Sequence, residues 1–220
     1  MIKNIFHFFT FANGSPKKAS EINQSEKISF VENIVKMHKL AKRFKSKFKR
    51  NNRDLFCFDF EEYIFKLYPK VEFLCFLRKE LDSIKINIGK KSDKILKIAI
   101  HNDLSINNIF FKDNKVSSIV DFDDCCFGAR ISDLANAIFD FYCDGFRLHK
   151  EEINFFIDQY SRSYFLENDE IDIMNDLLKY RLIIYILFYF YYWKITKKDF
   201  YLKNYQKYYK ILKIIMNMYK

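Results

Sequence analysis

The segment HNDLSINNIFF at residues 101–111 places charged and amide side chains between two apolar runs, which constrains the local fold. The run before it, ILKIAI at 95–100, has the character of a β-strand. After it, NIFF and VSSIVDF flank the polar turn KDNK, and this pattern predicts a β-hairpin. The polar residues of the segment therefore lie in a loop that leaves one strand and enters a hairpin. A hydrophobic core does not require such residues at this position.

Two side chains with oxygen donors stand at the two ends of the predicted hairpin. Asn108 precedes its first strand and Asp121 ends its second strand. Because a hairpin brings its ends together, we expect these side chains to lie close to each other, as suits a hard cation such as Mg²⁺. Asp103 can reach the same centre from the loop, and a carboxylate beside the metal is suited to accept a proton from an attacking hydroxyl. A base and a metal clamp make up half of a phosphoryl-transfer site.

The simpler alternative is a set of caps and turn residues in a chain rich in Asp and Asn. Asp123 and Asp124 have two interpretations: they contact a metal or a substrate, or they are solvated turn residues. Arg130 follows closely in sequence, and an ion pair with one of these carboxylates is one option for it.

The pattern H-x-D-x-x-x-x-N at 101–108, followed by a hairpin and Asp121-Phe122-Asp123, resembles the aminoglycoside phosphotransferase, choline kinase and homoserine kinase superfamily. That superfamily is distantly similar to protein kinases. The segment ARISDLA at 129–135 is similar to one that follows in many members. The resemblance implies an α+β, mainly α-helical fold: a protein-kinase-like C-terminal lobe with a small β-hairpin at the catalytic loop.

The resemblance also implies roles for individual residues, with Mg²⁺ and ATP as cofactors. Asp103 would be the catalytic base, and Asn108 and Asp121 would be the magnesium ligands, with Asp123 a further candidate. Asp133 would be the buried acid that braces the catalytic loop from the following helix, and His101 would also brace that loop.

The remaining chain is predicted to be mostly helical. Apolar residues recur at helical spacing from about residue 25 to 48, with His38 on the apolar face as a half-buried packing residue. Further helices are expected near 59–68, before Gly89, from 132 to 142, and near 151–166, 170–193 and 197–219. The stretch 182–193 is apolar on most sides, which predicts a central helix.

No Gly-rich loop and no V-A-I-K-like strand precede His101, and Gly14 and Gly89 stand alone. We therefore expect residues 1–18 to be the hinge or a remnant of a small lobe and residues 19–220 to be the large lobe, with the ATP-binding lobe missing. A separately encoded small lobe as a partner, a misplaced start codon and a decaying relic are three explanations. Loss of the phosphate-cradling groups would cost on the order of 10³-fold in rate.

The net charge of +10 is uneven, with basic blocks at 36–53 and 194–220 and an acidic segment at 101–145. The basic blocks are interpreted as solvated helix faces, and they carry no nucleic-acid-binding motif. The five Cys residues form no CxxC pair and are expected to be reduced core residues. The longest apolar run has 12 residues, short of the roughly 20 that cross a membrane. A soluble, cytoplasmic protein without a membrane or specific nucleic-acid partner is expected.

The expected function is ATP-dependent phosphorylation of a hydroxyl on a small metabolite. Asp140 lies two helical turns after Asp133, close to an acidic position of homoserine kinase-like and choline kinase-like members. This favours an amino alcohol, with homoserine-like substrates ahead of choline-like ones, whereas an exposed helix carboxylate is the alternative for Asp140. A non-catalytic kinase-like binding module or gene fragment, and a basic nucleic-acid-binding protein, are the rival functions.

Overall fold

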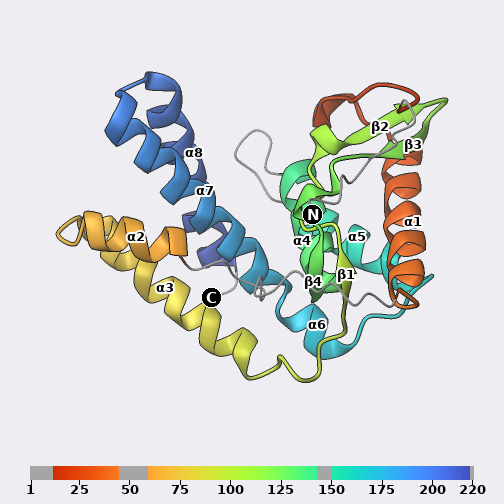
Figure 1. The fold of residues 1–220 in the computed structure, drawn as a ribbon, viewed down its shortest axis with the longest axis horizontal. Helices are drawn as coiled ribbons and strands as arrows, with labels where there is room; N and C mark the ends of the chain where they lie inside the picture. Colours follow the sequence, from red (N-terminus) through yellow and green to blue (C-terminus); the bar gives the residue numbers. More distant parts are fainter. Residues whose placement is uncertain (1–11, 45–58, 143–149, 219–220) are drawn as a thin grey trace, which may run out of the picture.

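Helices dominate the computed structural model, which describes residues 12–44, 59–142 and 150–218 (Figure 1). On one side lie α1 (Gln24–Ala41) and α5 (Lys150–Ser161), and α4 (Arg130–Tyr142) lies towards the middle. The other side is formed by α2 (Asp59–Leu67), α3 (Glu72–Gly89), α7 (Met174–Thr196) and α8 (Asp199–Met218). The short α6 (Asn168–Asp172) precedes α7. The fold is α+β and mainly helical, as predicted.

Helix α1 begins where its capping residues place it. The Asn23 side chain accepts a hydrogen bond from the Glu26 backbone N–H at 3.0 Å, and the Glu26 carboxylate accepts one from the Asn23 N–H at 3.1 Å. This capping box satisfies backbone donors that the first helical turn leaves free. The apolar face of α1 then packs against α5 and the strands β1 and β3. The described cations of the basic block at 36–53 are exposed, as expected of a solvated surface: Lys36, Lys39, Lys42 and Arg43.

The predicted hairpin is present as β2 (Ile109–Lys112) and β3 (Lys115–Ile119). Asp113 and Asn114 connect the strands with φ values of 51° and 58°, the left-handed conformation that a two-residue hairpin turn requires. The strand predicted at 95–100 is β1 (Lys97–Ile100), and it pairs antiparallel with β4 (Cys126–Ala129). Strand β4 was not predicted, because CFGA has neither the length nor the alternation that marks a strand.

Helix α7 is the centre of the helical side, as predicted. It contacts α2, α3, α4, α6 and α8, and its buried residues lie around much of its circumference. Within the described part of the chain, no helix is both long and apolar enough to cross a membrane.

The expectation of five reduced core Cys residues is corrected at Cys75, which is exposed on α3. Cys126 is buried and Cys125 is half-buried, and neither forms a disulfide bond within the described part of the chain. Cys57 and Cys143 lie outside the described residues, as do residues 1–11 of the expected hinge and the end of the helix predicted to reach residue 48.

The chain before α1 attaches to the hairpin at Ser15. Its N–H donates to the Phe111 carbonyl at 3.2 Å, and the Phe111 N–H donates to the Ser15 carbonyl at 2.9 Å. Gly14 precedes this bridge with φ of +93°, and a Cβ built there would lie 2.5 Å from the Phe111 carbonyl oxygen. Both the backbone conformation and the close approach therefore require glycine.

Gly14→Ala is expected to lower the free energy of unfolding by about 1–3 kcal/mol, because alanine must adopt a strained φ or push the segment away from β2. Urea denaturation followed by circular dichroism measures this change. Gly89→Ala is the matched control, since a Cβ at that α3 position meets no atom within 4 Å. Equal stability of the two variants would contradict the account of Gly14.

Candidate active site

The loop at 101–108 is held by the buried carboxylate of Asp133, on the first turn of α4. Asp133 Oδ2 accepts the backbone N–H of His101 at 2.9 Å, and Oδ1 accepts that of Asn102 at 2.8 Å. Asn102 has φ of 68°, a left-handed conformation that turns the chain away from β1. The structure thus places Asp133 where the resemblance implied, against the backbone of this loop.

Asp133 has a third partner that the sequence did not suggest. His38 Nε2, on α1, lies 3.0 Å from Asp133 Oδ2, and His38 Nδ1 lies 2.8 Å from the Tyr160 hydroxyl. A carboxylate only accepts hydrogen bonds, so Nε2–H donates to Asp133, and Nδ1 of the neutral ring then accepts from the Tyr160 hydroxyl. The prediction of a half-buried packing role for His38 was wrong, because this network draws the ring fully into the interior.

His101 joins the loop to the end of the hairpin. Its ring is buried, with Nε2 2.9 Å from the Val120 carbonyl and Nδ1 accepting the Asp103 N–H at 3.3 Å. The Val120 N–H in turn donates to the Asn108 carbonyl at 3.0 Å. These contacts hold the segment before Asp121 beside the loop.

Both carboxylate oxygens of Asp103 accept hydrogen bonds. Oδ2 accepts from Asn108 Nδ2 at 3.0 Å, and Oδ1 accepts from a terminal nitrogen of Arg181, on α7, at 3.2 Å. The Asp103 side chain is 34% exposed, so a reactant can still reach it. Sequence reasoning missed Arg181, which lies 78 residues further on in a helix with no motif of its own.

Asn108 and Asp121 flank the paired end of the hairpin, where Ile109 lies opposite Ile119. The Asn108 amide nitrogen is committed to the side chain and the carbonyl of Asp103, which leaves its Oδ1 as the donor atom for a cation. Asp121 adopts φ of 65° and is exposed. An amide and a carboxylate oxygen fit Mg²⁺, which binds through few protein oxygens and completes its shell with water and phosphate.

No group of three or more His, Cys, Asp or Glu side chains able to hold a metal occurs among the described residues. Asp123 and Asp124 lie in a short 3₁₀ turn, Phe122–Asp124, directly after Asp121. Asp123 is exposed and Asp124 is half-exposed. Their contact with a metal or a substrate stays a prediction.

Arg130 does not pair with Asp123 or Asp124, which was one option for it, but with Glu170. The Arg130 N–H donates to the Leu96 carbonyl before β1, whereas the loop at 101–108 follows the other end of that strand. The buried guanidinium instead binds Glu170 at 2.8 and 2.6 Å and the Phe165 carbonyl at 2.6 Å. A buried arginine requires such a partner, and α6 supplies it. Arg130 is therefore a structural residue outside the site.

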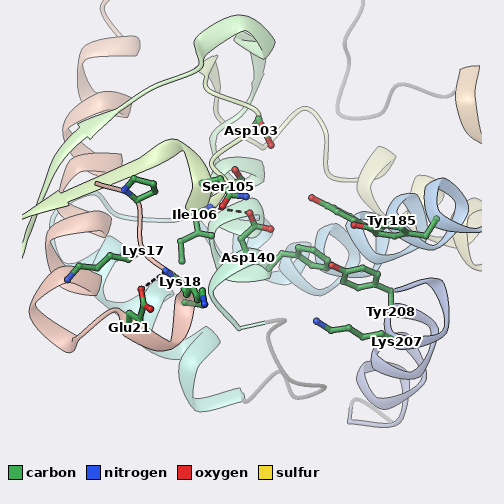
Figure 2. A pocket seen from close by; sticks show the side chains of 15 residues that line it. Lys17, Lys18, Glu21, Asp103, Ser105, Ile106, Asp140, Tyr185, Lys207 and Tyr208 are labelled. Atoms are coloured by element: carbon green, nitrogen blue, oxygen red, sulfur yellow. Dashed lines mark hydrogen bonds between the residues drawn. The ribbon is translucent and has the colours of Figure 1, made fainter. Parts of the chain in front are cut away.

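A cavity of about 720 Å³ opens beside Asp103 (Figure 2). Asp140 lies at its centre, where Oδ2 accepts the Ile106 N–H at 3.2 Å. Burial raises the pKa of Asp140 to about 6, although Arg181 opposes this shift. Tyr185 and Tyr208 lie on one side of the cavity, and Lys18 and Glu21 lie on the other. Asp140 is therefore a cavity residue and not the exposed helix carboxylate of the alternative.

Comparisons with solved structures agree with a kinase-like fold. Amicoumacin kinase hAmiN is matched with a TM-score of 0.64 and 16% identity, over 92% of this chain and 63% of that one. A microcompartment-associated aminopropanol kinase is matched with a TM-score of 0.66 and 15% identity, over 89% and 62%. An ethanolamine kinase of Plasmodium vivax is matched with a TM-score of 0.63 and 18% identity, over 98% and 68%.

At these identities the structural neighbours show the fold alone, and the chain spans less than two thirds of the first two of them. No curated protein matches the sequence. A family model, described as the phosphotransferase enzyme family (APH), matches residues 16–172, which include the loop at 101–108, the hairpin and Asp133. The chain belongs to the APH phosphotransferase enzyme family.

Proposed function

We propose that this chain transfers the γ-phosphoryl group of ATP to a hydroxyl group of a small amine-bearing metabolite. The observation that carries the proposal is that the Asp103 carboxylate, held by Asn108 and Arg181, borders a cavity with Asp140 at its centre. The chain spans 62–63% of the first two kinases it resembles. Its activity, its substrate and its division into a hinge (1–18) and a large lobe (19–220) are therefore all part of the proposal.

In this reaction Asp103 accepts the proton of the attacking hydroxyl while the loop backbone stays fixed by Asp133. Asn108 and Asp121 would hold Mg²⁺, with Asp123 beside them. The metal ion would supply positive charge to the phosphates of ATP. Phosphoryl transfer depends mainly on positioning and charge. Asp133 and His101 would therefore contribute to the rate by holding the loop, and with it Asp103, in a fixed position.

The lining of the cavity supports an acceptor with an ammonium group. Asp140 provides a carboxylate, and aromatic rings next to it favour a cation: Phe139, Tyr185, Tyr189 and Tyr208. Lys207 on α8 also lines the cavity and suits the carboxylate of a hydroxy amino acid, which supports the proposal of homoserine over choline. Two of the structural neighbours are described as kinases of the amino alcohols aminopropanol and ethanolamine.

The test incubates the purified chain with ATP, Mg²⁺ and, one at a time, homoserine, ethanolamine, 1-amino-2-propanol and choline. Mass spectrometry then detects the phosphorylated product. Transfer to at least one amine-bearing acceptor is the expected result. A chain that transfers to none of them and shows no nucleotide-dependent change in melting temperature would instead favour a non-catalytic kinase-like module.

The affinity for an amine-bearing acceptor is expected to fall as the pH falls below about 6. Asp140 has a raised pKa of about 6, so it is ionised above that pH and becomes protonated as the pH decreases through it. Each further pH unit should then weaken binding by about tenfold, because the ammonium group loses its counter-charge. Titration calorimetry between pH 5 and pH 8 measures this, and Asp140→Asn should bind weakly with little dependence on pH. A wild-type affinity that is constant across this range would exclude Asp140 as the ammonium partner.

A further inference from the structure

The guanidinium group of Arg181 has more donors than the structure uses. Of its five N–H groups, the described residues engage one, which donates to Asp103 Oδ1 at 3.2 Å. Arg181 Nε is buried and has no hydrogen-bond partner among the described residues. The side chain packs over the Tyr185 ring at 5.4 Å and is 21% exposed. Nε is closed to solvent, but the side chain is partly exposed, so the terminal N–H groups that Asp103 does not engage are available to an anionic ligand that is not part of the chain.

The position of Arg181 determines which anionic group would come to it. Asp103 is the base of the proposed function, on which this inference rests. The hydroxyl that gives its proton to Asp103 is also the atom that attacks the phosphoryl group, so that group must lie within a few ångströms of the Asp103 carboxylate. A guanidinium in contact with Asp103 is therefore next to the transferred phosphoryl group before and after transfer.

We propose that Arg181 binds the transferred phosphoryl group, and hence the phosphate of the phosphorylated product, from the α7 side of the site. Its planar N–H groups match phosphate oxygens in geometry as well as in charge. The role resembles that of a cation which stabilises the charge developing on a phosphoryl group.

The other described cations near the cavity are less suited to this role. The loop at 101–108 contains neither Lys nor Arg. Lys17 is paired with Glu26 at 2.6 Å. Figure 2 shows Lys18 and Lys207 on the two sides of the cavity, away from Asp103. Among the described residues near the cavity, Arg181 is thus the cation that contacts Asp103 directly.

The test compares the binding of phosphorylated and unphosphorylated acceptors, which requires neither ATP nor turnover. O-phosphohomoserine and O-phosphoethanolamine, with homoserine and ethanolamine as their partners, are titrated by calorimetry into wild type, Arg181→Gln and Arg181→Lys. Arg181→Gln should weaken binding of the phosphorylated compounds about ten- to a hundredfold, the usual size of a charge-assisted hydrogen-bond pair. Binding of the unphosphorylated compounds should change less than about threefold, and Arg181→Lys should fall between Gln and wild type because it keeps the charge.

The matched control is Arg78→Gln. Arg78 also pairs with a carboxylate, Glu62 at 3.1 Å, but it lies on α3 and does not line the cavity. This variant should bind all four compounds as the wild type does. Melting temperatures are recorded for every variant. If Arg181→Gln does not fold, the affinities of Arg181→Lys are compared with those of the wild type instead.

A double variant separates contact with phosphate from neutralisation of Asp103. In an Asp103→Asn background Arg181 has no carboxylate to neutralise, so a further Arg181→Gln change should still weaken binding of the phosphorylated compounds about tenfold or more. Equal affinity with and without Arg181 in that background would overturn the inference. So would a loss that is the same for phosphorylated and unphosphorylated compounds, or failure of the wild type to bind either phosphorylated compound at millimolar concentration.

Failure of the proposed function has a different signature. If the wild type binds the phosphorylated compounds through Arg181 but transfers no phosphoryl group from ATP, the inference about Arg181 stands and the catalytic proposal does not. If transfer occurs and Arg181→Gln leaves both product affinity and kcat unchanged, the catalytic proposal stands alone.

Discussion

Replacing Asp103 with asparagine is expected to reduce phosphoryl transfer by about 10²- to 10⁴-fold, the usual contribution of a general base. An amide keeps the shape of the carboxylate but cannot take the proton of the attacking hydroxyl. The fold should be retained, because Asp103 is one third exposed and does not belong to the hydrophobic core. The measurement is kcat for the best acceptor found in the screen, with the melting temperature of the variant recorded beside it.

The matched control is Asp113→Asn, in the turn of the β2–β3 hairpin. Asp113 is exposed and has φ of 51°, a conformation that asparagine tolerates, so this variant should keep both activity and stability. An Asp103→Asn protein with wild-type turnover would remove Asp103 from the role of base. A loss of activity in both variants would point to a general effect of substitution in this part of the chain.

The second large effect is expected on stability. Asp133→Ala should lower the free energy of unfolding by about 3–5 kcal/mol, because it leaves buried donors without their acceptor. These donors are the backbone N–H groups of His101 and Asn102 and, on α1, His38 Nε2. Urea denaturation measures the total effect, and the melting temperature should fall by roughly 10 °C for a chain of this size.

Hydrogen exchange can locate this effect within the molecule. The amides of His101 and Asn102 should lose protection in Asp133→Ala before the helical core does, because they donate directly to the missing carboxylate. Asp158→Ala is the control, since Asp158 is an exposed residue of α5, where such a substitution changes stability by about 0.5 kcal/mol or less. A variant at residue 133 as stable as this control would show that the loop is held by other contacts.

The sequence predicted the strand, the loop and the hairpin that carry the candidate site, because the signals for these elements are local. Asn108 and Asp121 are at the two ends of the hairpin, and Asp103 lies in the loop just before it. Strand pairing brings the two ends together: the Val120 N–H donates to the Asn108 carbonyl, and Ile109 lies opposite Ile119. The position of Asp133 could be expected from the segment that resembles the family. Asp140 follows it by two helical turns, so their relative placement depends on helix geometry alone.

The errors concern side chains whose partners come from distant parts of the chain. His38 looked like a packing residue, yet its partners Asp133 and Tyr160 are 95 and 122 residues away. Arg130 was linked to acids close to it in sequence, but it pairs with Glu170, 40 residues further on. For such residues a helical pattern shows which face is buried but not which helix covers it.

Hydrophobic periodicity and residue spacing were enough to predict most of the helices, the hairpin and the polar loop between two strands. These elements can be predicted from sequence because their backbone hydrogen bonds join residues that are close together in the chain. The packing of α7 against α4 and the loop was needed to bring Arg181 to Asp103 and to enclose Asp140 in a cavity. That packing depends on the fit of apolar surfaces across the whole molecule. The position of Arg181 in α7 does not indicate Asp103 as its partner, because the two residues meet only once the helices have packed together.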